Sequence, residues 1–247
     1  MSETVSLPDL SDRRVLIPGG TGGVGEGAVR AYLAAGAQVV VPTRSQERAQ
    51  EFRALLGKDA TERLHLFEHD YTSFAGAEGL VETMVDRLGG VDDVVAPIGG
   101  WWQGKSLWEI DEEDWQGAFV GLATAHMAVV RAALPRMSRQ GAYCIVVGPS
   151  AHFPIPGSGL VSMQQTALLM MHQVLAAELQ DAKRVFLLEP GPVATRFIQA
   201  PDPAQVTSAQ IGAVAVAASA STQPGRHVQL SNRVQAEDAL ASFGTAR

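Results

Sequence analysis

The sequence of 247 residues predicts an α/β domain in which helices cover both faces of a doubly wound, seven-stranded parallel sheet. Two observations lead to this fold class. Short runs of β-branched and other apolar residues alternate with stretches of helical periodicity along the chain. The short runs are almost continuously apolar, as is expected of strands that are buried on both faces of a parallel sheet.

The elements follow each other in a regular β/α alternation. We expect the strands within residues 13–18, 37–43, 63–69, 92–98, 142–148, 184–190 and 226–231. We expect the helices within residues 24–36, 45–57, 73–90, 111–137, 159–179 and 207–221. Because no linker or repeat divides the chain, residues 1–247 are expected to form a single domain. Residues 1–12 would be an N-terminal arm and residues 233–247 a loosely held C-terminal tail.

The composition argues against several classes of function. The net charge of −7 leaves no basic stripe for nucleic acid. The one cysteine, Cys144, lies in an apolar run and is expected to be a buried thiol. No cluster has the spacing of a metal site. The N-terminus lacks a signal-like apolar core, and the apolar stretches are shorter than a membrane span. We therefore expect a soluble cytoplasmic protein with no nucleic-acid, membrane or metal partner.

A glycine-rich loop between the first strand and the first helix indicates a nucleotide site of the Rossmann type. Glycines let backbone N–H groups approach a ligand, and the helix N-terminus that follows favours a pyrophosphate. The spacing is Gly19-x-x-x-Gly23-x-Gly25, and a G-x-G-x-x-G pattern starting at Gly20 is also met by chance. The loop residues expected to hold the cofactor are Gly19, Thr21, Gly22, Gly23, Val24 and Gly25.

This glycine spacing resembles that of the short-chain dehydrogenase/reductase family, and the resemblance extends along most of the chain. The segments "VDDVVAPIGG" and "EPGPVATRF" are similar to the family's fourth strand and to the segment that closes over the nicotinamide. The resemblance implies a nicotinamide cofactor and hydride transfer to or from a carbonyl or alcohol. It also implies cofactor contacts at Asp70, Tyr71, Gly99, Pro190, Gly191, Val193 and Thr195.

The end of the second strand favours NADP(H) over NAD(H). NAD-binding proteins typically carry an acidic residue here, which accepts hydrogen bonds from the ribose hydroxyls. This chain has Thr43 followed by Arg44. An Arg side chain pairs with a 2′-phosphate, whereas a carboxylate would repel it. The alternative is that Arg44 is simply solvated at the start of a helix.

The resemblance breaks down at the catalytic positions. The family uses a Tyr, a Lys four residues later, a Ser and an Asn. Matched by position, Val161 replaces the Tyr, Gln165 replaces the Lys and Leu122 replaces the Asn. Ser150 matches the Ser and would orient a carbonyl oxygen. His152 lies two residues further on, and either this imidazole or water would supply the proton. A loop histidine that faces solvent is the alternative for His152.

The tryptophans suggest a substrate pocket. All four fall between positions 101 and 115, after the fourth strand. Trp101 and Trp102 would line a pocket for an apolar or aromatic carbonyl substrate. The alternative is that they merely hold the loop to the next helix. For Trp115 we expect this second role. We expect Lys105 to be solvated. The carboxylate of Glu189 is expected to matter less than its backbone.

Three functions remain open on the sequence. The first is an atypical NADP(H)-dependent oxidoreductase without the usual Tyr/Lys pair. The second is a non-catalytic NADP(H)-binding sensor or structural subunit, and the third is a non-redox lyase or isomerase on the same fold. The helices within residues 111–137 and 157–180 carry apolar residues around more than one face. We therefore expect a homodimer or homotetramer that pairs through these helices, with His126 as a packing or interface histidine.

Overall fold

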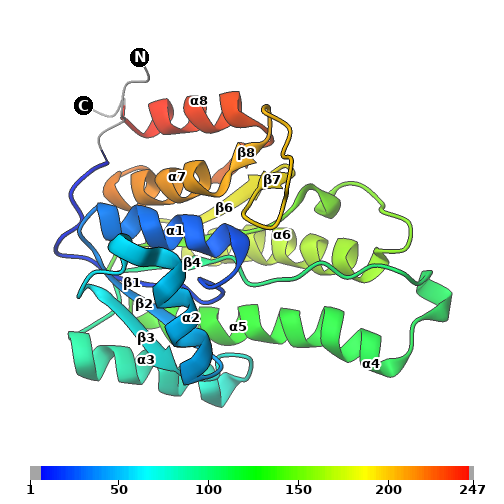
Figure 1. Cartoon of the computed structure of the whole chain (residues 1–247), viewed down its shortest axis with the longest axis horizontal. Helices are drawn as coiled ribbons and strands as arrows, with labels where there is room; N and C mark the ends of the chain where they lie inside the picture. The colour runs from blue at the N-terminus through cyan, green and yellow to red at the C-terminus, as the bar shows by residue number, and fades with distance from the viewer. Residues whose placement is uncertain (1–6, 245–247) are drawn as a thin grey trace.

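The computed structural model describes residues 7–244 (Figure 1). Its main sheet has seven parallel strands in the order β3-β2-β1-β4-β5-β6-β9, which confirms the predicted fold class. These strands are β1 Arg14–Leu16, β2 Gln38–Thr43, β3 Leu64–Glu68, β4 Asp93–Ala96, β5 Ala142–Val146, β6 Arg184–Pro190 and β9 His227–Leu230. Each lies within a segment predicted from the sequence. Strand order reverses between β1 and β4, so a ligand is expected beyond the carboxyl ends of these strands.

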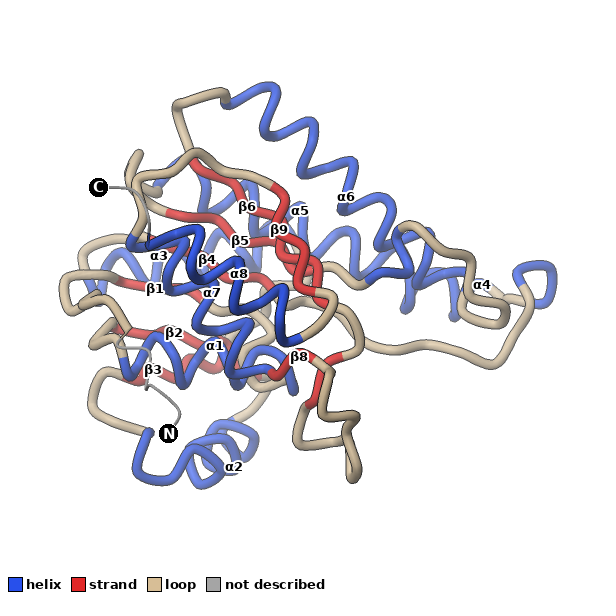
Figure 2. Tube along the Cα trace, turned by 90° about the horizontal axis from the view of Figure 1, so that it is seen from above, coloured by secondary structure: helices blue, strands red, loops and turns tan. Residues whose placement is uncertain are grey.

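Helices cover both faces of the sheet (Figure 2). One face packs against α1 Gly23–Ala34, α2 Gln46–Leu56, α7 Ser208–Ala220 and α8 Arg233–Gly244. The other packs against α3 Phe74–Leu88, α5 Gly121–Ala133 and α6 Gly159–Leu179. Successive strand residues point to opposite faces, so Val39 and Val41 belong to the first core and Val40 to the second. Both cores are therefore built from the continuously apolar strands.

The helix expected within residues 111–137 is interrupted by other helical turns. It consists of α4 Glu112–Trp115, a π-helical segment Gln116–Val120, α5, and a final 3₁₀ turn Leu134–Arg136. Together these elements run from Glu112 to Arg136 with a mean hydropathy of 1.5 over their most apolar window. This corrects the expectation that every apolar stretch is too short to span a membrane. Half of the window is buried inside the fold, and the core helix of a soluble protein meets the same criterion.

The prediction of a loosely held C-terminal tail at residues 233–247 is wrong for residues 233–244. Arg233–Gly244 forms α8, which packs on α7 and places Phe243 in the core at 6% exposure. The apolar residues of α8 do not recur at a regular helical spacing, so the sequence shows no clear amphipathic face there. Residues 245–247 lie outside the described part of the chain, as do residues 1–6 of the expected N-terminal arm. Leu10, in the remainder of that arm, is buried.

A small two-stranded sheet lies beyond β6 and was not predicted. It pairs β7 Val193–Ala194 with β8 Val206–Thr207 in parallel. The connection between these strands, residues 195–205, contains the short segment that follows Thr195. In Figure 1 this connection forms the yellow-orange loop beside the N-terminal end of α1. The small sheet therefore fixes both ends of the segment that approaches the glycine-rich loop.

Candidate functional site

A cavity of about 350 Å³ lies where the strand order reverses. It is bordered by the loops after β1, β2, β3 and β4 and by the start of α5. Its lining residues are Gly19, Thr21, Gly22, Pro42, Thr43, Arg44, Arg48, Tyr71, Thr72, Pro97, Ile98, Gly99, Gly117, Gly121, Leu122 and Ala125. The structure thus brings together predicted cofactor residues from four separate junctions of the chain.

The glycine-rich loop is shaped by close backbone contacts. Gly19 has φ of +82°, and a Cβ there would lie 2.6 Å from the carbonyl oxygen of Pro97. A Cβ on Gly25 would lie 2.3 Å from the carbonyl oxygen of Gly19. The loop therefore folds back on the first turn of α1. Gly22 precedes α1 and provides no side-chain cap, so the first N–H groups of this helix can meet an anionic ligand.

The segment after β6 meets the glycine-rich loop. A Cβ on Gly23 would lie 2.9 Å from Cβ of Thr195, so these two residues are in contact. Arg196 donates a hydrogen bond to the carbonyl of Thr21 at 3.0 Å and forms an ion pair with Glu26 of α1. Pro190 and Gly191 are buried at the end of β6, and Val193 starts β7. The predicted closing segment is thus tied to the predicted phosphate loop.

Two arginines line the cavity beside the end of β2. Arg44 directly follows the strand, and Arg48 lies one turn later in α2. Both are exposed, and within the described residues neither side chain makes an ion pair. Thr43 is buried, and its hydroxyl faces the carbonyl of Phe67 at 3.4 Å. The sequence pointed to Arg44 but not to Arg48, because Arg44 lies before the N-cap Ser45 and the turn into α2 that brings Arg48 to the cavity is not specified by residue spacing.

A second hollow of about 460 Å³ adjoins the first along the end of β3. It shares Arg44 and Tyr71 with the cavity and is also lined by Asp70. Asp70 accepts hydrogen bonds from the backbone N–H of Thr72 at 2.9 Å and from its hydroxyl at 2.6 Å, and these bonds lower the pKa of the Asp70 carboxyl. Burial raises the pKa of the Tyr71 hydroxyl. Both predicted residues therefore flank the arginine pair.

The catalytic positions after β5 carry Ser150, Val161 and Gln165, and the side chain of Val161 is buried. Ser150 is buried in a 3₁₀ turn, Pro149–Ala151, that follows the strand. Gln165, at the position of the family's Lys, accepts a hydrogen bond from the N–H of Gly148 at 2.5 Å. Its amide donates to the side chain of Gln164 at 2.6 Å. An uncharged amide therefore reaches the end of β5 in place of an ammonium group.

Within residues 7–244, the tyrosines and lysines lie on elements other than α6. Helix α6 contains neither residue type. Tyr32 and Tyr143 are fully buried in the core, and Tyr71 lies beside the arginine pair. Lys183 follows the far end of α6 and donates a hydrogen bond to the carbonyl of Met137. Lys105 forms ion pairs with Asp111 and Asp114, so it is not the freely solvated side chain that we expected.

His152 is held by a carboxylate. Its Nε2 lies 3.0 Å from Oε2 of Glu189 at the end of β6, and Nε2 of His227 lies 2.7 Å from the same oxygen. The side chain of Glu189 is 8% exposed, and those of His152 and His227 are 37% and 31% exposed. This corrects the expectation that the carboxylate of Glu189 matters less than its backbone. The sequence missed the contact because His227 is far away along the chain, on the edge strand β9.

His126 and Leu122 lie on α5 below the cavity. Leu122 lines the cavity, where the family's Asn would lie. His126 is fully buried, and its Nε2 donates to the carbonyl of Ile98 at 2.7 Å. Burial lowers the pKa of His126 to about 4. His126 is thus a packing histidine that holds the loop after β4.

The tryptophans do not line the cofactor cavity. The indole N–H of Trp102 donates to Asp114 in α4 at 3.3 Å, so this ring holds its loop to the helix. Trp101 is 64% exposed and donates to Gln103 at 3.1 Å. Trp115 stacks on Phe119 with ring centroids 4.6 Å apart. The contacts of Trp102 therefore fit the second role considered for it, which is to hold its loop to α4.

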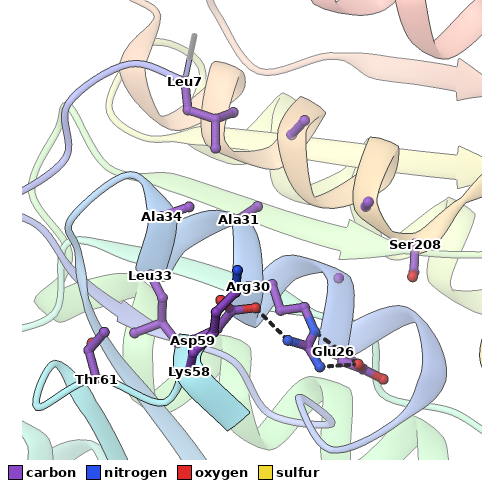
Figure 3. A pocket seen from close by; sticks show the side chains of 13 residues that line it. Leu7, Glu26, Arg30, Ala31, Leu33, Ala34, Lys58, Asp59, Thr61 and Ser208 are labelled. Carbon is purple, nitrogen blue, oxygen red and sulfur yellow. Dashed lines mark hydrogen bonds and ion pairs between the residues drawn. The ribbon is translucent and has the colours of Figure 1, made fainter. Parts of the chain in front are cut away.

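Another hollow of about 460 Å³ lies on the outer side of α1, between α7 and residues 58–61 (Figure 3). Three of its four charged side chains pair with each other: Arg30 lies 2.8 Å from Glu26 and 2.5 Å from Asp59. The glycine-rich loop and the arginine pair do not line it. We therefore place the candidate functional site at the carboxyl ends of the strands and not at this hollow.

The fold and these loops define a dinucleotide-binding protein of the doubly wound α/β class. Residues 19–225 match the family model described as enoyl-(acyl carrier protein) reductase. The chain is 31% identical over 196 residues to dehydrogenase/reductase SDR family member 4 of Bos taurus, covering 76% of this chain and 68% of that protein. The chain therefore belongs to the short-chain dehydrogenase/reductase family. Its relatives are oxidoreductases that use a nicotinamide cofactor and small-molecule substrates.

Two further similarities are informative. The 1,2-dihydroxy-1,2-dihydronaphthalene dehydrogenase of Pseudomonas putida is 28% identical over 185 residues, covering 73% of this chain and 70% of that protein. A solved short-chain oxidoreductase from Pseudomonas aeruginosa PAO1, described as containing an atypical catalytic center, has a TM-score of 0.77 at 21% identity. That comparison covers 90% of this chain and 97% of the other, and it supports the fold alone.

Proposed function

We propose that this protein is an NADP(H)-dependent oxidoreductase that reduces a carbonyl, or oxidises the corresponding alcohol, without the Tyr/Lys pair of its family. The observation that carries the proposal is the combination of two features. The phosphate loop and the arginine pair line one cavity and the closing segment contacts the phosphate loop, whereas α6 offers neither Tyr nor Lys. The backbone cradle suits a dinucleotide, because close backbone contacts at Gly19 and Gly25 exclude side chains there and the first N–H groups of α1 are left without a side-chain cap.

NADP(H) would be held along the carboxyl ends of β1 to β4. The backbone of Gly19, Thr21 and Gly22 would face the pyrophosphate at the start of α1. Arg44 and Arg48 would pair with the 2′-phosphate, since each is exposed in the cavity and lacks an ion-pair partner among the described residues. Thr195 would meet the nicotinamide end. When bound, this cofactor supplies or accepts the hydride.

Residues of this chain would bind the carbonyl oxygen of the substrate and donate the proton that it receives. Ser150 would donate its hydroxyl hydrogen to the substrate oxygen and orient the carbonyl. His152 would protonate that oxygen during reduction, because an imidazole gains and loses its proton near neutral pH. Glu189 accepts from Nε2 of His152, so the remaining ring nitrogen, Nδ1, would carry the transferred proton. Gln165 would keep the end of β5 in place through Gly148.

A fluorescence titration with NADPH and NADH tests the cofactor assignment. We expect NADPH to bind more tightly than NADH, and Arg44→Ser and Arg48→Ser each to weaken NADPH binding by about tenfold or more, as loss of a hydrogen bond to a charged group would. Neither substitution should affect NADH. Lys58→Ser, which removes an exposed positive charge outside the cavity, is the matched control. Equal affinity for both cofactors in the unmodified protein would refute the NADP(H) assignment.

An apolar or aromatic substrate is proposed with this function. The ring of Phe153 is 66% exposed and meets the ring of His152 edge-on at 6.5 Å, so an aromatic surface adjoins the proposed proton donor. The Pseudomonas putida relative is named for an aromatic dihydrodiol. Oxidation of that dihydrodiol with NADP⁺ and reduction of a panel of aromatic ketones should both be assayed. If only small aliphatic carbonyls react, the aromatic assignment is wrong.

A non-catalytic NADP(H) sensor is the second candidate, and the absence of Tyr and Lys from α6 favours it. Such a protein would bind NADPH with the same preference but oxidise it with no carbonyl. A homodimer or homotetramer is proposed for either function, because exposed apolar side chains project from both α5 and α6. These are Met127, Met163, Met170 and Val174. Analytical ultracentrifugation with and without NADPH measures the oligomer, and a monomer in both would contradict the pairing.

A further inference from the structure

Three side chains form a compact cluster at the edge of the sheet, where the turn after β5 meets β6 and β9. We call His152, Glu189 and His227 the His–Glu–His cluster. Oε2 of Glu189 lies between the two Nε2 atoms, at 3.0 Å from His152 and 2.7 Å from His227. The two imidazole rings are nearly parallel, with an interplanar angle of 12° and centroids 6.5 Å apart. The three residues come from the turn before α6, from β6 and from β9.

The carboxylate depends on these two imidazoles. A buried carboxylate is costly unless it is paired. Among the described residues, no Arg or Lys forms an ion pair with Glu189. An ionised carboxylate only accepts hydrogen bonds, so each Nε2 must carry the hydrogen that it shares with Oε2. The exchangeable position on each ring is therefore Nδ1.

Few other titratable groups face the cluster. On α6, His172 is near His227; it is buried, and its Nε2 donates to the carbonyl of Val185 at 3.2 Å. Burial lowers the pKa of His172, so this imidazole stays neutral near neutral pH. The metal-binding alternative has no support, because within residues 7–244 no group of three or more His, Cys, Asp or Glu is arranged to hold a metal ion.

We propose that the His–Glu–His cluster replaces the family's Tyr/Lys pair as the proton-donating device: Glu189 positions His152 and stabilises its imidazolium form, and His227 competes for the same carboxylate oxygen. This inference rests on the proposed function. In reduction, the hydride adds to the carbonyl carbon and the proton on Nδ1 of His152 moves to the oxygen. His152 is left neutral and takes its next proton from solvent. Glu189 is thus a positioning residue, and His227 tunes its effect.

Substitution of Glu189 and substitution of His227 should shift the pH dependence of carbonyl reduction in opposite directions. Glu189→Gln removes the negative charge beside the imidazole, so the pH at which carbonyl reduction falls to half its plateau should drop. The same change should lower kcat by about 10- to 100-fold, as loss of a carboxylate that orients a functional histidine does elsewhere. His227→Gln removes the competing imidazole, so the half-maximal pH should rise. NADPH affinity should be unchanged in both variants.

The test is a pH profile of kcat and KM for the unmodified protein, Glu189→Gln, His227→Gln and the control His65→Gln. His65 lies on β3 and pairs with Gln38. Histidine NMR titration of the same four proteins, without cofactor or substrate, follows the protonation of His152 directly. Opposite shifts in both measurements support the proposal. Shifts in the same direction, or lower activity with an unchanged half-maximal pH, would assign the cluster a merely structural role.

The same experiment separates two kinds of failure. If the unmodified protein reduces no carbonyl, yet His152 and His227 titrate as a coupled pair that Glu189→Gln uncouples, the proposed function is wrong and the coupling within the cluster stands. If the protein reduces carbonyls and Glu189→Gln leaves both the pH profile and the NMR titration unchanged, the proposed function stands and the role of the cluster is refuted.

Discussion

Acidification should destabilise this fold through His126. The imidazole is fully buried, and its Nδ1 has no hydrogen-bond partner among the described residues. Burial lowers its pKa from the ordinary value of 6.5 to about 4. Because the folded pKa lies below the unfolded one, the unfolded chain binds more protons between these values, and stability is lost as the pH falls. With these two pKa values, the free energy of unfolding should fall by about 2 kcal/mol between about pH 8 and about pH 5.

Urea unfolding of the unmodified protein and of His126→Gln, at one protein concentration, measures this loss. The glutamine amide can still donate to the carbonyl of Ile98 but does not titrate. Between the two pH values, His126→Gln should lose about 2 kcal/mol less than the unmodified protein. His69→Gln, at a less buried position, should follow the unmodified protein. Equal losses in all three proteins would refute the assignment of a buried neutral imidazole.

Three further substitutions test the site and the core. Gly25→Ala places a Cβ 2.3 Å from the carbonyl of Gly19 and should abolish NADPH binding in the fluorescence titration, whereas Gly244→Ala, in α8 with open space around it and outside the cavity, should preserve binding. Tyr32→Phe removes a buried hydroxyl that bonds to α7, so the free energy of unfolding should fall by about 1–3 kcal/mol. Phe243→Ala should cost about 3–5 kcal/mol if α8 is part of the core; no loss would mean that the tail is loosely held after all.

The sheet was predictable because its strands are hidden on both faces. Val39, Val40 and Val41 succeed each other without a polar residue, and only a strand between two helical layers buries all three. Helix α8 was missed for the converse reason. It packs on α7 and β9, and the ring of Phe243 meets that of Phe186 in β6, so Phe243 and a few alanines suffice to anchor it and its apolar residues form no strong helical stripe.

The cofactor loops were predictable because each is a short local motif. The carboxyl ends of parallel strands meet at one edge of the sheet, so Gly19 and Arg44 could be assigned to one place before their distances were known. The His–Glu–His cluster could not be found this way. His227 and Glu189 meet through the pairing of β6 with β9, and single-sequence patterns do not specify which side chains of two strands point together. Arg48 was not predicted, because Arg44 lies outside α2 and no helical spacing links the two arginines.

We propose that hydride transfer occurs here without the family's Tyr and Lys. The most direct measurement uses NADPH deuterated at the transferable position, an aromatic ketone, and mass spectrometry of the alcohol. Our account predicts a single deuterium on the carbinol carbon, and a rate that falls by about 100-fold or more in the double variant of Ser150→Ala and His152→Gln. A protein that binds NADPH tightly but transfers no deuterium to any carbonyl in the panel would contradict the account and favour the sensor.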